Sequence, residues 1–209
     1  MLLELRLDDF LRELSSKASV PGGGSVSAVT GAMAAALISM VCNLTTGNKE
    51  YADVEERIKG IVEKSENLRD ELSKLVDKDA DAFSDVIHAI KMPQETEEDK
   101  VLRHEAIQHA LQKAALVPLK TMELSKDALL LAREVAECGS KNAISDAGVA
   151  AILADAAIKA AKINVDINLA SIEDAEFTDK IAKKCDDILA EIDGVLDECL
   201  EIVERKIYS

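Results

Sequence analysis

Apolar and polar residues recur with the period of an α-helix along nearly the whole chain of 209 residues. No segment shows the sustained alternation that marks a strand with one buried face. Turn signals separate the periodic segments, at Pro21 and the glycines after it, at Gly47, at Pro93 and at residues 138–142. The pattern predicts an all-α fold, in which residues 1–209 form a single-domain bundle of six to eight helices.

The ends of the helices follow from capping residues and helix breakers. Ser25 is the expected N-cap of the second helix, and Thr96, followed by three acidic residues, begins the fourth. Pro118 lies inside the fourth helix and predicts a kink or a break there. The expected helices span residues 7–16, 25–45, 52–90 (broken at most once), 96–137, 145–169 and 174–206.

Residues 18–48 carry no charge, in a chain in which 31% of residues are charged. The segment 26–44 is long enough to span a bilayer, but it contains four polar residues and no aromatic anchors. We therefore expect a buried helix of a soluble protein. Small residues let helix backbones approach one another, and they occur here at Ala28, Gly31, Ala32 and Ala35.

The formal net charge of −15 argues against nucleic acid or an anionic membrane as the main partner, because both require a basic surface. An anionic small molecule needs only a local basic patch. The four cysteines form no CxxC pair and the N-terminal segment is charged, which predicts a cytoplasmic protein with reduced, buried thiols. The three histidines form no HExxH pattern, and no metal site is expected.

Four aspartates lie close together in the predicted helix 52–90, but their helical phases differ. Asp79 falls within an apolar stripe, whereas Asp77, Asp81 and Asp85 fall on the solvent side or off the stripe. The stripe consists of Leu72, Leu75, Val76, Phe83, Val86, Ile87 and Ile90. Burial raises the pKa of a carboxyl group toward values suited to proton transfer. Asp79 is therefore a candidate proton-transfer group. The alternatives are an ion pair with a lysine or arginine of another helix, or a helix that faces solvent at this position.

The predicted helix 145–169 also carries polar residues on an apolar face. Asn164 lies at the centre of the stripe, Asn168 at its edge and Asp146 on the same face near the N-terminus. The stripe consists of Val149, Leu153, Ala156, Ala157, Ala160 and Ile167. A core amide usually bonds to a neighbouring helix, so a helix contact is the alternative to ligand binding here.

Gly22, Gly23 and Gly24 lead into the N-terminus of a predicted helix. Free amides and the helix dipole at such a terminus favour an anionic or carbonyl-bearing ligand. The glycines form neither a GxGxxG fingerprint nor a P-loop. A flexible turn with a close helix crossing explains the same residues without a ligand.

Five segments occur in order along the chain: PGGGS before the small-residue helix, LVDKDADAF, VPL, SDAGVAA and NVDINL. Together they resemble the cyclodeaminase/cyclohydrolase family, which comprises the formiminotetrahydrofolate cyclodeaminase domain and its methenyltetrahydrofolate cyclohydrolase relatives. The resemblance extends from Phe10 to about Leu200. The loop before SDAGVAA departs from the family pattern GNxNxxSD, because Ser140 replaces the first asparagine while Asn142 remains.

The resemblance implies an all-helical homodimer that binds a tetrahydrofolate derivative near the subunit interface, with no cofactor beyond this substrate. It implies cyclisation of 5-formiminotetrahydrofolate to 5,10-methenyltetrahydrofolate with release of ammonia. The family's essential aspartate falls on Asp79, which the helical phase also selects, and we expect it to be the catalytic residue that carries protons. The predicted substrate-binding residues are Gly22, Gly23, Gly24, Ser25, Asn142, Asp146, Asn164 and Asn168.

Two alternatives remain open from the sequence. A methenyltetrahydrofolate cyclohydrolase uses the same pocket with water as the nucleophile. A non-catalytic folate-binding or adaptor dimer has no reason to place a carboxylate in an apolar core stripe. An Asp79 that is ion-paired in the core and distant from any cavity would favour that class. The candidate residues for binding the glutamate tail of folate are Lys49, Arg57, Lys91 and Lys141.

Overall fold

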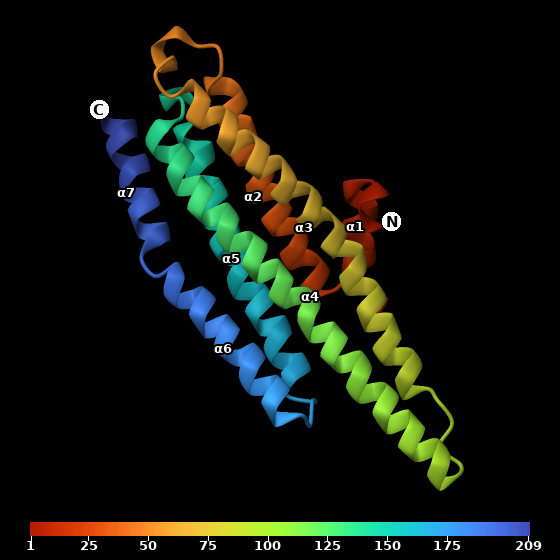
Figure 1. Ribbon diagram of the computed structural model, residues 1–209. Coiled ribbons are helices and arrows are strands. Elements are labelled where there is room, and N and C mark those ends of the chain that lie inside the picture. The colour runs from red at the N-terminus through yellow and green to blue at the C-terminus, as the bar shows by residue number, and fades with distance from the viewer.

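The computed structural model describes residues 1–209 as an elongated bundle of helices without strands (Figure 1). The all-α prediction is therefore confirmed. The α-helices are α1 (Leu7–Leu14), α2 (Gly23–Thr45), α3 (Glu55–Ile90), α4 (Glu97–Cys138), α5 (Ile144–Leu169), α6 (Ala175–Glu191) and α7 (Val195–Tyr208). The short 3-10 helices are η1 (Leu2–Glu4), η2 (Lys49–Tyr51) and η3 (Lys141–Ala143).

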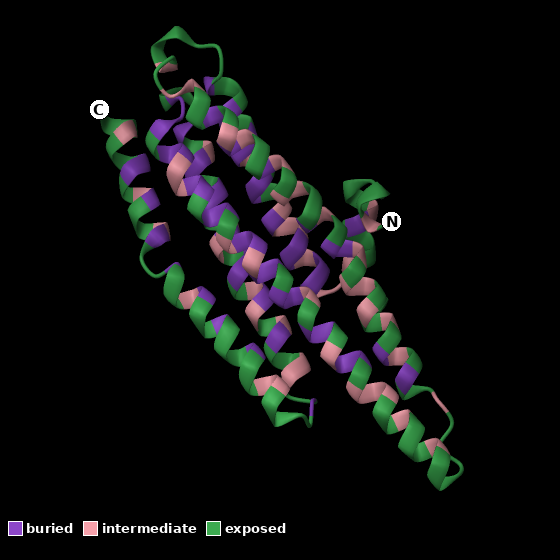
Figure 2. Ribbon diagram, viewed as in Figure 1, coloured by how far each residue is buried: buried purple, intermediate pink, exposed green.

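The four long helices α2 to α5 form the body of the bundle. α2 and α4 pack across the diagonal, whereas α3 and α5 occupy opposite corners. The core between α2, α4 and α5 is rich in alanine, including Ala34, Ala132 and Ala154, which are fully buried. Because small side chains let helix backbones approach closely, this core forms with few aromatic residues. α6 and α7 cover one flank, and buried residues gather on the inward faces of the long helices (Figures 1 and 2).

α2 crosses its neighbours closely, as its small residues predict. A Cβ atom at Gly31 would lie 2.6 Å from the Ser125 hydroxyl oxygen and 3.1 Å from a methyl carbon of Leu72. α2 is long and apolar enough to cross a membrane on length and composition alone, yet 56% of its most apolar window is buried within the protein. All four cysteines are buried and free.

Two of the predicted helices differ from the structure in whether they are continuous. α4 runs unbroken through Pro118, because packing over 42 residues offsets the loss of one backbone hydrogen bond, so the helix does not break there. The predicted last helix is divided into α6 and α7 at Gly194, whose φ of 77° is left-handed and ends a helical run. α3 is continuous over 36 residues, within the prediction of at most one break.

The predicted N-cap of α2 is wrong, whereas the predicted N-cap of α4 is confirmed. α2 begins at Gly23 with Gly22 as its N-cap, so Ser25 lies inside the first turn and its prediction as the cap is wrong. The start at Thr96 is confirmed by a capping box with Asp99. The Ser25 side chain is therefore free to act elsewhere than at the helix end.

The α3–α4 hairpin projects beyond the N-terminus of α2 (Figure 1). In this projecting part, Val86 of α3 packs with Leu111 and Ala115 of α4 in a small apolar cluster. The first turn of α2 therefore lies beside α3, α4 and α5, whose side chains come together there.

Candidate active site

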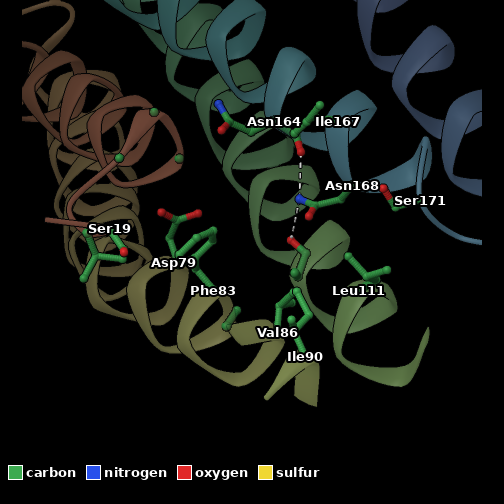
Figure 3. A pocket seen from close by; sticks show the side chains of 16 residues that line it. Ser19, Asp79, Phe83, Val86, Ile90, Leu111, Asn164, Ile167, Asn168 and Ser171 are labelled. Carbon is green, nitrogen blue, oxygen red and sulfur yellow. Dashed lines mark hydrogen bonds between the residues drawn. The ribbon is translucent and has the colours of Figure 1, made fainter. Parts of the chain in front are cut away.

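A cavity of about 420 Å³ lies at the N-terminus of α2, between α3, α4 and the C-terminal turns of α5 (Figure 3). Its polar lining consists of Ser19, Gly22, Gly23, Gly24, Asp79, Asn164, Asn168 and Ser171. Its apolar lining consists of Val20, Ala82, Phe83, Val86, Ile90, Leu111, Ala114 and Ile167. Asp79 is the only titratable residue in the lining.

Ser25 holds the Asp79 carboxylate in place. The Ser25 hydroxyl donates to Asp79 Oδ2 at 2.9 Å and to the Val76 carbonyl at 3.1 Å. Burial raises the pKa of Asp79 above its ordinary value, and the hydrogen bonds from the hydroxyl and amide of Ser25 offset part of this rise. No cation forms an ion pair with this carboxylate, so the ion-pair alternative is wrong. Asp79 can therefore gain and release a proton inside a largely apolar cavity.

The close approach to the glycine run is made by the protein's own side chains. A Cβ atom at Gly24 would overlap the Asp79 carboxylate, and one at Gly23 would lie 3.3 Å from the amide of Asn164. Of the three glycines in this run, only Gly22 has no atom within 4 Å of the position that a Cβ atom would take. Gly23 and Gly24 thus make room for Asn164 and Asp79, respectively. All three glycines line the cavity, and their binding of a substrate stays a prediction.

Asn164 and Asn168 lie one turn apart near the end of α5 and face the cavity (Figure 3). Asn164 Nδ2 donates to the Ala160 carbonyl at 2.8 Å. Asn168 Nδ2 donates to the Asn164 carbonyl at 2.8 Å and to the Ala114 carbonyl at 3.4 Å. The helical phase of α5 thus brings both predicted asparagines to the same cavity as Asp79.

Asn142 and Asp146 lie at the opposite end of α5, which has 26 residues and is therefore roughly 39 Å long. Around them, Thr45 accepts a hydrogen bond from the Ser140 amide, and the Tyr51 hydroxyl accepts one from the Lys141 amide. The prediction that Asn142 and Asp146 join Asp79 in one site is wrong within a single chain. The resemblance ordered these residues along the sequence, but a long helix keeps them apart.

The candidate residues for the glutamate tail are divided in the same way. Lys49 and Lys141 belong to η2 and η3 at the far end, and Arg57 pairs there with Glu134 and Glu137. Lys91 alone directly follows a cavity residue, Ile90.

Two details of the predicted α3 stripe are also corrected. Phe83 and Ile90 are 41% and 44% exposed, because they line the cavity and are not part of the core. Asp77 is not on a solvated face, since its Oδ1 accepts a hydrogen bond from the Leu2 amide at 2.6 Å. Asp81 and Asp85 are exposed, as predicted.

Sequence reasoning missed six further cavity residues, which are Ser19, Val20, Ala82, Leu111, Ala114 and Ser171. Ser19 and Ser171 lie outside regular helices, where periodicity carries no information. Leu111 and Ala114 lie on an ordinary apolar stripe of α4, and only the proline four residues after Ala114 distinguishes that position.

The bundle and its cavity define an all-helical domain with a single titratable carboxyl group in a cavity at a helix N-terminus. Residues 6–187 match the family model described as formiminotransferase-cyclodeaminase, and the chain belongs to this family.

Named relatives extend this result. The methenyltetrahydrofolate cyclohydrolase of Methylorubrum extorquens is 41% identical over 201 residues, which cover 96% of this chain and 97% of that protein. The formimidoyltransferase-cyclodeaminase of Rattus norvegicus is 35% identical over 91% of this chain, which matches only 35% of the rat protein. The crystal structure of formiminotetrahydrofolate cyclodeaminase from Thermotoga maritima superposes with a TM-score of 0.88 at 35% identity, covering 99% of this chain and 100% of that one. The relatives are named as enzymes, in agreement with the enzyme prediction.

Proposed function

We propose that this protein is a folate one-carbon enzyme that cyclises 5-formiminotetrahydrofolate to 5,10-methenyltetrahydrofolate and releases ammonia. The observation that carries the proposal is the cavity around Asp79. A single carboxyl group, held by Ser25 and raised in pKa by burial, lies in a largely apolar cavity of about 420 Å³. A cavity of this size suits a small organic ligand.

The reaction needs positioning and proton transfer more than an enzyme nucleophile. N10 forms a bond to the carbon of the protonated formimino group, and the bond from that carbon to the amino nitrogen then breaks. N10 loses a proton and the departing nitrogen gains one, so that neutral ammonia leaves and the methenyl cation remains. In the proposed mechanism Asp79 takes the N10 proton and delivers a proton to the leaving group. The cavity walls hold N5 and N10 in the cyclising conformation.

A methenyltetrahydrofolate cyclohydrolase is the second candidate. It is favoured by the M. extorquens relative of that name, which matches this chain over nearly the full length of both. In this reaction Asp79 would take a proton from the water that attacks the methenyl carbon. The bond from that carbon to N5 would then break as N5 gains the proton of the new hydroxyl group, which leaves 10-formyltetrahydrofolate and releases one proton to solvent. A non-catalytic adaptor has less support, because Asp79 lines a cavity and has no cationic partner.

A homodimer with the site near its interface also belongs to the proposal. α2 and α5 pack side by side, and both expose apolar side chains. These are Met33, Met40 and Leu44 on α2, and Val149, Ile152, Ile163 and Ile167 on α5. Ile167 is 68% exposed and also lines the cavity, so a second copy seated on this surface would lie at the cavity's edge. Burial of such a surface stabilises obligate dimers.

Sedimentation tests the dimer. The wild type is expected to sediment as a dimer and Ile152→Lys as a monomer or a strongly weakened dimer. Leu130→Lys is the matched control, because Leu130 is an exposed apolar residue of α4, away from the proposed interface. A monomeric wild type at working concentration would overturn the interface.

The activity test follows methenyltetrahydrofolate by its absorbance. Wild-type protein is expected to form it from 5-formiminotetrahydrofolate, and Asp79→Asn is expected to bind tetrahydrofolate without turnover. If the protein hydrolyses added methenyltetrahydrofolate but does not cyclise 5-formiminotetrahydrofolate, it is a cyclohydrolase and the cyclodeaminase proposal is wrong. Failure to bind tetrahydrofolate would overturn both.

A further inference from the structure

Both N–H donors of the Asn168 amide are occupied by backbone carbonyls. The dashed lines in Figure 3 join its Nδ2 to the carbonyl oxygens of Asn164, at 2.8 Å, and Ala114, at 3.4 Å. A primary amide has two N–H donors and one carbonyl oxygen. Turning this amide over would place Oδ1 against two other oxygens, so the hydrogen-bond network selects the observed orientation. Only Oδ1, an acceptor, is left for a ligand.

The Ala114 carbonyl is available to Asn168 because of Pro118. In an α-helix each carbonyl accepts a hydrogen bond from the amide four residues later. The residue four positions after Ala114 is Pro118, which has no amide hydrogen. Pro118 is buried in α4 and does not itself line the cavity. The proline thus leaves an acceptor in the cavity wall that anchors the asparagine from α5.

The surroundings of Asn168 make this acceptor selective. Its neighbours in the cavity include Ile167 and Leu111, and Asp79 lies on the other side of the cavity (Figure 3). In an apolar setting an acceptor without a donor is costly, because it gives up its hydrogen bond to water. A ligand seated against this wall therefore binds more tightly when it directs an N–H or O–H donor at Asn168 Oδ1.

We propose that Asn168, oriented by the Ala114 carbonyl that Pro118 leaves free, is the acceptor that recognises the N–H donor edge of the pterin ring. That edge consists of the 2-amino group and N3–H of the pyrimidinone. The inference rests on the proposed folate function and deepens it by assigning one edge of the substrate to one wall of the cavity. Asn168 is a binding residue, and Pro118 is a positioning residue that acts through it.

The test is a double-mutant cycle on binding, with tetrahydrofolate and its 2-desamino-2-methyl analogue as the two probes. Wild-type protein is expected to bind the analogue about 10- to 100-fold more weakly, because the analogue keeps N3–H but lacks the 2-amino group, whose N–H is the donor assigned to Asn168 Oδ1. In Asn168→Ala that ratio is expected to fall to nearly 1. Asn67→Ala, the same change at an exposed site on α3 outside the cavity, is expected to keep the wild-type ratio.

Pro118→Ala gives an independent readout. The new amide hydrogen can bond to the Ala114 carbonyl and loosen Asn168, so tetrahydrofolate binding is expected to weaken by about 3- to 10-fold. Binding of the analogue should change little, and the melting temperature should not fall, because helix α4 gains a hydrogen bond. A lower melting temperature with equal weakening for both probes would reduce Pro118 to a structural role and overturn its part of the proposal.

The outcomes separate this inference from the proposed function. If tetrahydrofolate binds and turns over while the ratio stays at its wild-type value in Asn168→Ala, the assignment of Asn168 is wrong and the function stands. If neither probe binds to wild type, the proposed function fails and the inference fails with it.

Discussion

The two ends of helices α2 and α5 carry similar residues and use them differently. At one end, Ser25 and the glycines before it meet Asp79 at a cavity. At the other end, Thr45 and Ser140 accept hydrogen bonds from backbone amides of the loop between α4 and α5. Hydroxyl groups thus orient a cavity-lining carboxylate at the first end and pair with the backbone of a chain reversal at the second.

The comparison shows that residue type alone does not mark a site. Serine, asparagine and glycine serve turns as readily as ligands, because both need short polar groups and a free backbone. The cavity end is distinguished by a carboxyl group that lacks a cationic partner and is nevertheless held in place. We therefore expect substitutions at the cavity end to change catalysis and those at the far end to change stability.

Asp79→Asn should have the largest effect, a loss of about 10²- to 10⁴-fold in kcat, the range typical of a general acid–base residue. The folded state raises the pKa of Asp79 above 3.8, so it holds the proton more tightly than the unfolded chain. This group's contribution to the free energy of unfolding therefore falls as pH rises through that raised pKa. Asp79→Asn should consequently melt at the same or a higher temperature at neutral pH. A lower melting temperature would show that activity was lost through unfolding.

Gly24→Ala should come next, with a loss of about 10²-fold in kcat, because a displaced catalytic group reacts poorly. The added methyl group would overlap the Asp79 carboxylate. Gly22→Ala is the matched comparison, since nothing lies within 4 Å of the position that its Cβ would take, and its backbone is extended at φ −130°. It should leave kcat unchanged and act on KM only. Equal losses of kcat in both variants would contradict the role assigned to Gly24.

Ser25→Ala should shift the pH profile. The Ser25 hydroxyl bonds to the ionised carboxylate and lowers the pKa of Asp79, so its removal should raise that pKa. Since the proposed mechanism begins with ionised Asp79, the acid limb of kcat/KM should move to higher pH. Ser27→Ala is the control, because the buried Ser27 hydroxyl bonds only to the Gly24 carbonyl. If the acid limb of the pH profile does not move in Ser25→Ala, Asp79 does not take part in the rate-determining proton transfer.

Helical phase identifies the cavity end in the sequence because its polar lining residues Asp79, Asn164 and Asn168 lie on two regular helices. Asp79 on α3, and Asn164 and Asn168 on α5, could be selected by a period of 100° per residue and converge in the structure. The predicted solvated position of Asp77 is wrong because its partner, the Leu2 amide, lies 75 residues away and has no signature in local periodicity. The hydrogen bonds of Ser25 likewise depend on where α2 meets α3, which no local pattern encodes.

The far end shows the limit of an ordered set of motifs. Asn142 and Asp146 belong to the same ordered series of sequence segments as Asp79. They nevertheless lie at the opposite end of the bundle, because the length of α5 separates them from the cavity. Order along the chain constrains the fold, whereas membership of a site depends on which helix ends lie together in space. A second subunit is the remaining route by which these residues could approach a cavity.

Thr45→Val should have the smallest effect on catalysis, and its effect should fall on stability. Thr45 Oγ1 accepts a hydrogen bond at 2.8 Å from the buried Ser140 amide, which valine cannot accept. Leaving that amide unpaired should cost about 1–3 kcal/mol of unfolding free energy, with unchanged kcat/KM for the folded protein. Thr46→Val is the control, since the exposed Thr46 hydroxyl bonds only to a carbonyl of its own helix, and it should be nearly neutral. If fully folded Thr45→Val protein loses kcat/KM, the far end of the bundle affects catalysis, and its assignment to stability alone is wrong.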